Sequence, residues 1–277
     1  MMLLYRRWEA FCKTLQEKKI SSTTAAAVLA GKAKEPFTVL KHDVETNVKK
    51  AYAIAKIEHR YGHCGSYYVQ AYLLRSPKNV ALLQKMQAMG HEITYHYDVL
   101  DFAKGDMTLA MAEYAKNLAL FEENGFAVKT VCQHGNPVVE RVGYTSNRDF
   151  FRSDRVQALY PTVADVMVDL KRKAATDYTY YSDAGRRFKM IFDPLENDRV
   201  DSEDKNVPFE DLGALLMHCE GRNAIISMHP HRWGRSAVCS VARTCIFRVI
   251  RACAKLAMKV PILKKFMSRY YHLAKKL

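Results

Sequence analysis

Short runs of β-forming residues alternate with helical patterns along most of this sequence, and this order constrains the fold more than any other feature. We predict strands at residues 37–42, 66–70, 92–96, 129–133, 178–182 and 224–229. Helical patterns lie between them at about 45–61, 77–89, 107–124 and 208–220, and an amphipathic helix at 1–19 precedes the first strand. Strands that alternate with helices indicate parallel pairing through crossover helices, so we predict an α/β fold.

Polar side chains gather where the predicted strands end. LKHD closes the first strand, TYHYD the third, CQHGNP the fourth, YYSD a later one and SMHPHRW the last. A barrel of parallel strands brings its carboxyl ends to one face, where catalytic residues collect. We therefore expect these five clusters to contribute to one site.

Asp43 and His96 are the strongest candidates for metal ligands. An Asp at the exit of a buried strand either caps the next helix or binds a cation, and Asp43 fits both interpretations. His91 and His96 are five residues apart in one strand, so they point to opposite faces, and His96 at the strand end is the better ligand. Asp98 could hold the other ring nitrogen of His96 or bind the metal directly.

Two more histidines follow strand ends. A Gly-Asn-Pro turn exposes His134, and His229 follows the apolar run 225–228 in the same way. A lone His at such a position is usually a hydrogen-bonding residue, but two of them beside Asp43 and His96 favour a site. Asp and His side chains together suit zinc or another divalent first-row cation.

Length and cysteine usage indicate one domain in a reducing compartment. A chain of 277 residues, 49% of them apolar, can form one large α/β barrel. The seven cysteines are odd in number and form no CxxC pair, so neither a disulfide framework nor a zinc ribbon is indicated. No apolar run is long enough for a signal peptide or a membrane span. We expect a cytoplasmic protein.

The motif order LKHDVE, GHEITYHYD, CQHGNP, YYSDAGRRF, SMHPHRW resembles that of the NodB-homology polysaccharide deacetylases, carbohydrate esterase family four. Within that family it looks most similar to the variant WbmS-like branch linked to O-antigen and capsule synthesis. The resemblance covers about residues 37–233. It implies a distorted (β/α) barrel of about seven parallel strands and a divalent metal bound by one Asp and two His. The implied reaction is hydrolysis of an N-acetyl or O-acetyl group.

The resemblance also implies roles for individual residues. Asp43 falls on the metal-binding Asp of the family, and His96 falls on its first metal-binding His. His229 falls on the histidine that acts as general acid. His42 falls on the position of the general base, which is an Asp in the family, so either His42 or a nearby carboxylate would take the proton from water.

The sequence departs from the family pattern at further positions. Leu100 stands where the second metal-binding His is expected, and His134 stands where the family has a substrate-contacting Arg. Asp98, His134 or His42 could complete the metal shell, or the site could be degenerate and inactive. The replacements bring in new ionisable groups, which an inactive site has no need to keep.

Four more residues are candidates for catalysis or substrate binding. Asp183 would orient one of the histidines or bind a sugar hydroxyl. Arg186 and Arg187 could meet an acidic sugar or a diphosphate, although surface ion pairs explain them equally well. Trp233 could stack on a sugar ring, although a Trp after a strand is more often simply packed.

Positive charge is concentrated in residues 235–277, which we treat as a basic tail after a barrel at 1–234. From Gly221 onwards the chain has no Asp or Glu and 13 Lys or Arg, so residues 1–220 are close to neutral. Apolar and basic residues alternate at helical spacing, which indicates an amphipathic helix that either lies on an anionic membrane surface or packs on the barrel. No nucleic-acid-binding motif accompanies the charge.

Together these features predict a metal-dependent hydrolase that removes an N-acetyl or related acyl group from an amide-bearing sugar during surface-polysaccharide or lipopolysaccharide synthesis. The metal would be zinc, cobalt or manganese, and the sugar would be nucleotide- or lipid-linked. The tail would hold the enzyme on the inner face of the cytoplasmic membrane. The other interpretation is a catalytically degenerate protein of the same fold that binds glycan or docks on a membrane, and a third is hydrolysis of a different C–N bond.

Overall fold

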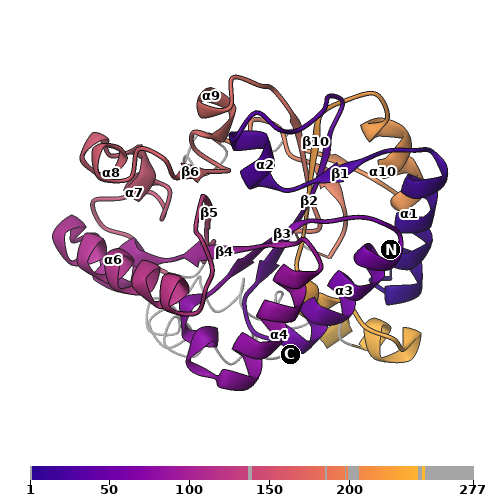
Figure 1. Cartoon of the computed structure of the whole chain (residues 1–277), viewed down its shortest axis with the longest axis horizontal. Helices are drawn as coiled ribbons and strands as arrows, with labels where there is room; N and C mark the ends of the chain where they lie inside the picture. The colour runs from indigo at the N-terminus through magenta and orange to yellow at the C-terminus, as the bar shows by residue number, and fades with distance from the viewer. Residues whose placement is uncertain are drawn as a thin grey trace.

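One ten-stranded sheet forms the centre of a mixed α/β fold (Figure 1). The computed structural model describes residues 2–136, 139–184, 186–196, 198, 206–242 and 245–246. Parallel pairing joins β6, β5, β4, β3, β2, β10 and β7, in that spatial order. These strands are β2 (Thr38–Val44), β3 (Ser66–Val69), β4 (Glu92–Tyr97), β5 (Thr130–Gln133), β6 (Ala164–Asp165), β7 (Thr179–Ser182) and β10 (Ala224–Met228).

Three short strands extend this parallel set. β1 (Ser22–Thr23) pairs with β2, and β8 (Lys189–Met190) and β9 (Val207–Pro208) continue antiparallel from β7. The six predicted strands are all present, and the predicted α/β class with a largely parallel sheet is confirmed. Sequence patterns missed β6 because a strand of two residues shows no alternation.

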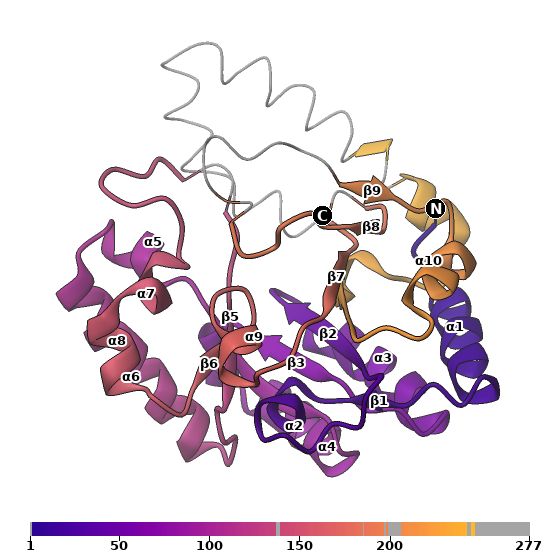
Figure 2. The same cartoon turned by 90° about the horizontal axis from the view of Figure 1, so that it is seen from above.

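Helices cover the outside of the sheet, with α1 and α10 on one flank and α6 and α8 on the other (Figure 2). The longer helices are α1 (Tyr5–Glu17), α3 (Val48–Arg60), α4 (Pro77–Ala88), α6 (Met107–Glu123) and α10 (Leu212–Cys219). The shorter ones are α2 (Ala25–Leu29), η1 (Ala71–Arg75), α5 (Val99–Ala103), α7 (Asp149–Arg152), α8 (Asp154–Leu159), α9 (Leu170–Lys173) and η2 (Pro230–Arg232). Several begin at a side-chain cap; Asp106, for example, accepts the backbone N–H groups of Thr108 and Leu109 before α6.

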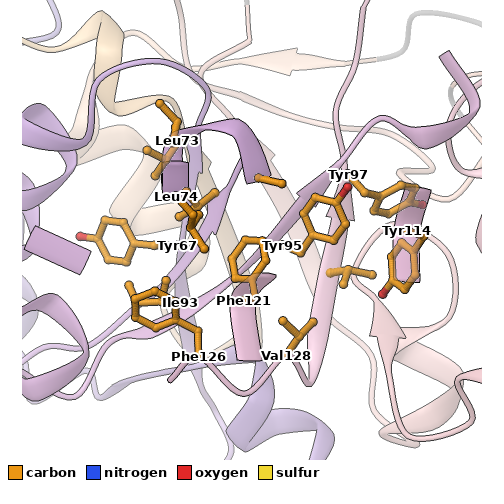
Figure 3. Packing of buried hydrophobic residues seen from close by; sticks show 14 of the residues in the cluster. Tyr67, Leu73, Leu74, Ile93, Tyr95, Tyr97, Tyr114, Phe121, Phe126 and Val128 are labelled. Atoms are coloured by element: carbon orange, nitrogen blue, oxygen red, sulfur yellow. The ribbon is translucent and has the colours of Figure 1, made fainter. Parts of the chain in front are cut away.

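Side chains of β2 alternate between the helices and the barrel interior. All seven residues of the strand are buried, because both faces are covered. Leu40 packs with residues of α1 and α3, whereas Val39 belongs to an interior cluster with Tyr68 and Ile225. The largest cluster fills the space between the sheet and helices α4 and α6, where Tyr95 and Phe121 meet (Figure 3).

Within the described residues, the two end strands of the parallel set, β6 and β7, are joined by a side-chain hydrogen bond and not by strand pairing. The barrel is therefore distorted. The Tyr178 hydroxyl, next to β7, donates to the backbone oxygen of Val166, next to β6, at 2.8 Å. Helix α2 crosses the amino ends of the strands, where the Ala26 N–H donates to the Glu92 carboxylate at 3.0 Å. Burial raises the pKa of Glu92 although Ser66 and Thr130 also donate to it. The opposite, carboxyl end of the barrel is where the polar motifs gather.

The described residues contain no helix that is long and apolar enough to cross a bilayer. Most of the basic tail predicted at 235–277 lies outside the described residues.

Candidate metal centre

Alternate residues of the VLKHDVE segment point into the barrel. Lys41 and Asp43 lie on the interior face of β2, and Glu45 follows directly after the strand. The Lys41 ammonium is fully buried, contacts Asp43 Oδ1 and lies 3.3 Å from Ser227 Oγ. It also lies over the Tyr68 ring, 5.0 Å from the centroid. The pair is therefore a buried salt bridge with additional hydrogen bonding and cation–π contact.

His96 and His134 reach the same place from neighbouring strands. His96 lies on β4, and its Nδ1 is 3.0 Å from the backbone oxygen of Cys132 on β5. A backbone oxygen is an acceptor, so Nδ1 carries the proton and Nε2 remains as a ligand atom. His134 follows β5, held by a 2.7 Å hydrogen bond from its N–H to the Tyr97 oxygen. The two rings are 5.2 Å apart and nearly perpendicular.

A buried carboxylate orients His229. His229 follows β10, and its Nδ1 lies 2.5 Å from Oδ1 of Asp183, which is fully buried. Arg232 Nη1 donates to the same oxygen at 3.1 Å, and the His229 N–H donates to Oδ2. Burial opposes ionisation of Asp183, but the adjacent His229 and Arg232 hold its pKa well below the usual range. An ionised Asp183 fixes the Nδ1–H tautomer and turns Nε2 towards the carboxylates of β2.

Two groups of side chains in this place could hold a metal ion. The lower group, nearer the barrel centre, is Asp43, His96 and Cys132; the upper group, nearer the strand ends, is Glu45, His96 and His134. Within each group the ligand atoms all lie within 4.8 Å of one another.

The spacing in the upper group suits a shared cation. Glu45 Oε1 lies 3.8 Å from His134 Nε2, which is too long for a hydrogen bond. His229, outside the group, has its Nε2 3.6 Å from the same oxygen. Two ligands about 2.1 Å from one tetrahedral ion are about 3.4 Å apart. Carboxylate and imidazole donors also match the ligand chemistry of zinc and other divalent first-row metals.

Charge and burial shift the pKa values of two of these residues. Burial opposes ionisation of Asp43, but Lys41, His96 and His229 lower its pKa to about 2. Burial lowers the pKa of His96 to about 4 although Asp43 opposes this change. At neutral pH the centre therefore holds an ionised carboxylate and a neutral imidazole, the forms in which both side chains bind metals.

Half of the predicted site residues come together here. Asp43, His96, His134, His229 and Asp183 form one contiguous cluster. Asp98, predicted as a ligand, lies at its margin.

The position of Asp98 is outside both candidate groups. Its side chain is 48% exposed, and Oδ2 lies 3.6 Å from His134 Nδ1 and 3.4 Å from the Gln70 amide that donates to it. Leu100 is buried in the hydrophobic cluster between sheet and helices. Position 100 therefore belongs to the core, and a histidine there would not face the interior of the barrel.

His42 requires a correction, because the structure places it on the other side of the strand from Asp43. Its ring is fully buried on the helix-facing side, stacks on Tyr67 at 4.1 Å, and has Nε2 2.9 Å from Glu58 Oε1. Adjacent residues of a strand point to opposite faces, so His42 cannot share a site with Asp43. Neither the base nor the third ligand can come from His42.

The predicted substrate-binding residues are distributed differently. Trp233 is fully buried, packs against Trp8 at 5.4 Å, and its Nε1 lies 3.4 Å from Asp183 Oδ2. It is therefore part of the core and cannot stack on a sugar. Arg187 is exposed, and its Nε donates to the backbone oxygen of Phe209 at 3.2 Å. Arg186 lies in the turn after β7, where its N–H donates to the Asp183 oxygen.

Sequence reasoning missed Glu45, Lys41 and Cys132. For Lys41 and Glu45 the sequence does carry a signal: positions 41, 43 and 45 alternate along the chain, which puts the side chains of Lys41, Asp43 and Glu45 on the same side. His231 was also missed; its ring lies 5.9 Å from that of His229, and burial lowers its pKa to about 3 although Glu45 opposes this change.

Fold and site together define a distorted α/β barrel with a candidate metal centre at the carboxyl ends of its strands. No family model and no curated protein sequence matches the chain. Among solved structures, the chain is similar to a CE4 esterase from Streptococcus mutans, with a TM-score of 0.43 and 13% sequence identity. The match covers 86% of this chain and 90% of that chain.

Proposed function

We propose that this protein is a divalent-metal-dependent hydrolase that removes an N-acetyl or related acyl group from a sugar. One observation carries the proposal: the Asp183–His229 pair directs Nε2 of the histidine at a cluster of buried carboxylates and imidazoles. Glu45 Oε1 and Asp43 Oδ2 lie 3.6 and 3.8 Å from that nitrogen. A tautomer-fixed imidazole beside a candidate metal centre is suited to proton transfer in acyl hydrolysis.

His229 has the position of a general acid. Two carboxylates face its Nε2, and Asp183 holds its Nδ1, so the ring is oriented to pass a proton through Nε2. From Nε2 the proton passes to the leaving amine nitrogen as the C–N bond breaks. A carboxylate of the cluster receives the proton of the attacking water, since His42 lies on the far side of the strand.

Residues of the two candidate groups would hold the metal, which we propose to be zinc, with cobalt or manganese as substitutes. The metal's contribution is that of a Lewis acid, which polarises the acyl carbonyl and makes water a better nucleophile. His96 contributes through Nε2, because Nδ1 is engaged by the Cys132 oxygen at 3.0 Å.

The order of the five motifs supports an amide-bearing sugar, nucleotide- or lipid-linked, as the substrate class and surface-polysaccharide synthesis as the setting. The test is acetate release from N-acetylated sugar nucleotides and glycolipids by purified protein supplied with zinc, cobalt or manganese. We expect release that a chelator abolishes and added metal restores. Metal-loaded protein that releases no acetate from any of these substrates would contradict the proposal.

We also propose that the basic tail attaches the protein to an anionic membrane surface, which would place it where lipid-linked sugars are made. Support comes from the 11 Lys or Arg and the absence of Asp or Glu in residues 235–277. Each basic residue near such a surface contributes about 1 kcal/mol of binding free energy. Flotation with anionic liposomes should retain the full chain and lose a chain without residues 236–277. Equal binding of both forms would rule the attachment out.

A further inference from the structure

The lower group already contains a cation. The Lys41 ammonium contacts Asp43 Oδ1. The ligand atoms of Asp43, His96 and Cys132 all lie within 4.8 Å of one another, so the ammonium lies beside the place that a metal bound by these three residues would take.

Removing Lys41 from this place would be costly. The ammonium is fully buried, so it needs the negative charge of Asp43 to offset its desolvation. Burial opposes the charged form of Lys41, but Asp43 raises its pKa well above the usual value. A metal ion in the lower group would both compete for Asp43 and repel the ammonium at short range.

The upper group lies beyond Lys41, towards the end of β2. Its members are Glu45, whose side chain is 10% exposed, and two nearly buried imidazoles, His96 and His134. All three lie at the carboxyl ends of β2, β4 and β5, so an ion there is next to His229.

We propose that Lys41 serves as the cation of the lower group, so that a divalent metal binds the upper group of Glu45, His96 and His134. The inference rests on the proposed function, because it names the ligands of that site. Asp43 is then a positioning residue that balances Lys41 with one oxygen and faces His229 with the other. His96 supplies a single Nε2, which serves the upper group.

Cobalt binding distinguishes the two groups without any activity measurement. The full chain, freed of metal and titrated with Co²⁺, should bind one ion per chain without a sulfur-to-cobalt charge-transfer band, and Cys132→Ser should leave the spectrum unchanged. Glu45→Gln and His134→Ala should each weaken Co²⁺ and Zn²⁺ binding by about 100-fold or more.

A charge-neutral double variant tests Asp43 without leaving a buried unpaired ammonium. Lys41→Met with Asp43→Asn should bind Zn²⁺ within about tenfold of the wild type. A sulfur-to-cobalt band that disappears in Cys132→Ser would overturn the proposal. So would metal binding that survives Glu45→Gln but is lost in the folded double variant, as judged by circular dichroism. Failure to bind either ion would also overturn it.

The two proposals fail separately. Metal bound by the upper group without acetate release contradicts only the hydrolase, whereas acetate release by an enzyme that keeps its metal in Glu45→Gln contradicts only the ligand assignment.

Discussion

Two buried glutamates near β2, each close to histidines, lie on opposite sides of that strand and differ in how their oxygens are used. Glu58, on the helix-facing side, accepts hydrogen bonds from Trp8 Nε1 at 3.0 Å and the Tyr67 hydroxyl at 2.7 Å. His42 Nε2 lies 2.9 Å away from it. Glu45, at the strand end, faces His134 and His229 at 3.8 and 3.6 Å.

The difference separates a structural cluster from a candidate site. Glu58 accepts hydrogen bonds from Trp8 and Tyr67, and His42 Nε2 lies 2.9 Å away, so both of its oxygens have close partners inside the protein, while His91 Nδ1 stands 3.8 Å away. Around Glu45 the ring nitrogens stand farther off, at distances that suit a shared ion, and the cluster lies at the strand ends of the barrel. Residue type alone does not distinguish them, since both combine a carboxylate with two imidazoles.

The largest effect we expect is on catalysis, at His229. His229→Asn keeps a donor for Asp183 but removes Nε2, so kcat should fall about 10²- to 10⁴-fold. Zinc content should stay near the wild-type value, because His229 belongs to neither candidate group. Acetate release and metal analysis on the same sample check both points. An unchanged kcat would remove His229 from the reaction.

The second effect is on stability, at Glu58. Glu58→Gln removes a fully buried charge that three side chains stabilise, so the free energy of unfolding should fall by about 3 kcal/mol or more. Urea unfolding measures it, with the exposed Glu122→Gln as a control expected to change by less than about 0.5 kcal/mol. Equal stability of both variants would mean that the helix-facing cluster does not hold the fold together.

The third effect is the pH dependence of that stabilisation. Burial would raise the pKa of Glu58, but His42, His91 and the Tyr67 hydroxyl lower it below 4.5. A carboxyl with a lowered folded pKa stabilises above its unfolded pKa, and this contribution disappears as pH falls through the folded value. The stability gap between wild type and Glu58→Gln should therefore be constant near neutrality and shrink below pH 4.5. A gap that widens with acidification would have the wrong sign.

The smallest effect concerns Trp233. Trp233→Phe removes one long hydrogen bond to Asp183 and some packing against Trp8, which should cost about 1 kcal/mol of stability. KM for an active substrate should not change, because the side chain is fully buried. A KM raised tenfold without a loss of stability would restore Trp233 as a sugar-binding residue.

The sequence allowed the strands and the gathering of Asp43, His96, His134, His229 and Asp183 to be predicted, because hydrophobic runs ending in polar residues are a local pattern. The predicted end of the first strand at His42 was two residues early, since the strand runs to Val44. That boundary error concealed the alternation that separates His42 from Asp43.

Other parts of the site depend on contacts between distant residues. The role of Lys41 depends on Ser227 of β10 and Tyr68 of β3, which no local pattern relates to it. Cys132 has no metal-binding spacing in the sequence and comes near Asp43 only through the strand order. The burial of Trp233 depends on packing against the amino-terminal helix.

Zinc content of Glu45→Gln and Glu58→Gln, measured per folded chain after removal of free metal, tests the contrast between the two glutamates most directly. The two substitutions are chemically identical and act on opposite sides of one strand. We predict that Glu58→Gln retains one zinc per chain, although it is less stable, and that Glu45→Gln retains almost none. Equal zinc content in the two variants, or loss only in Glu58→Gln, would contradict the assignment of the metal centre to the carboxyl ends of the strands.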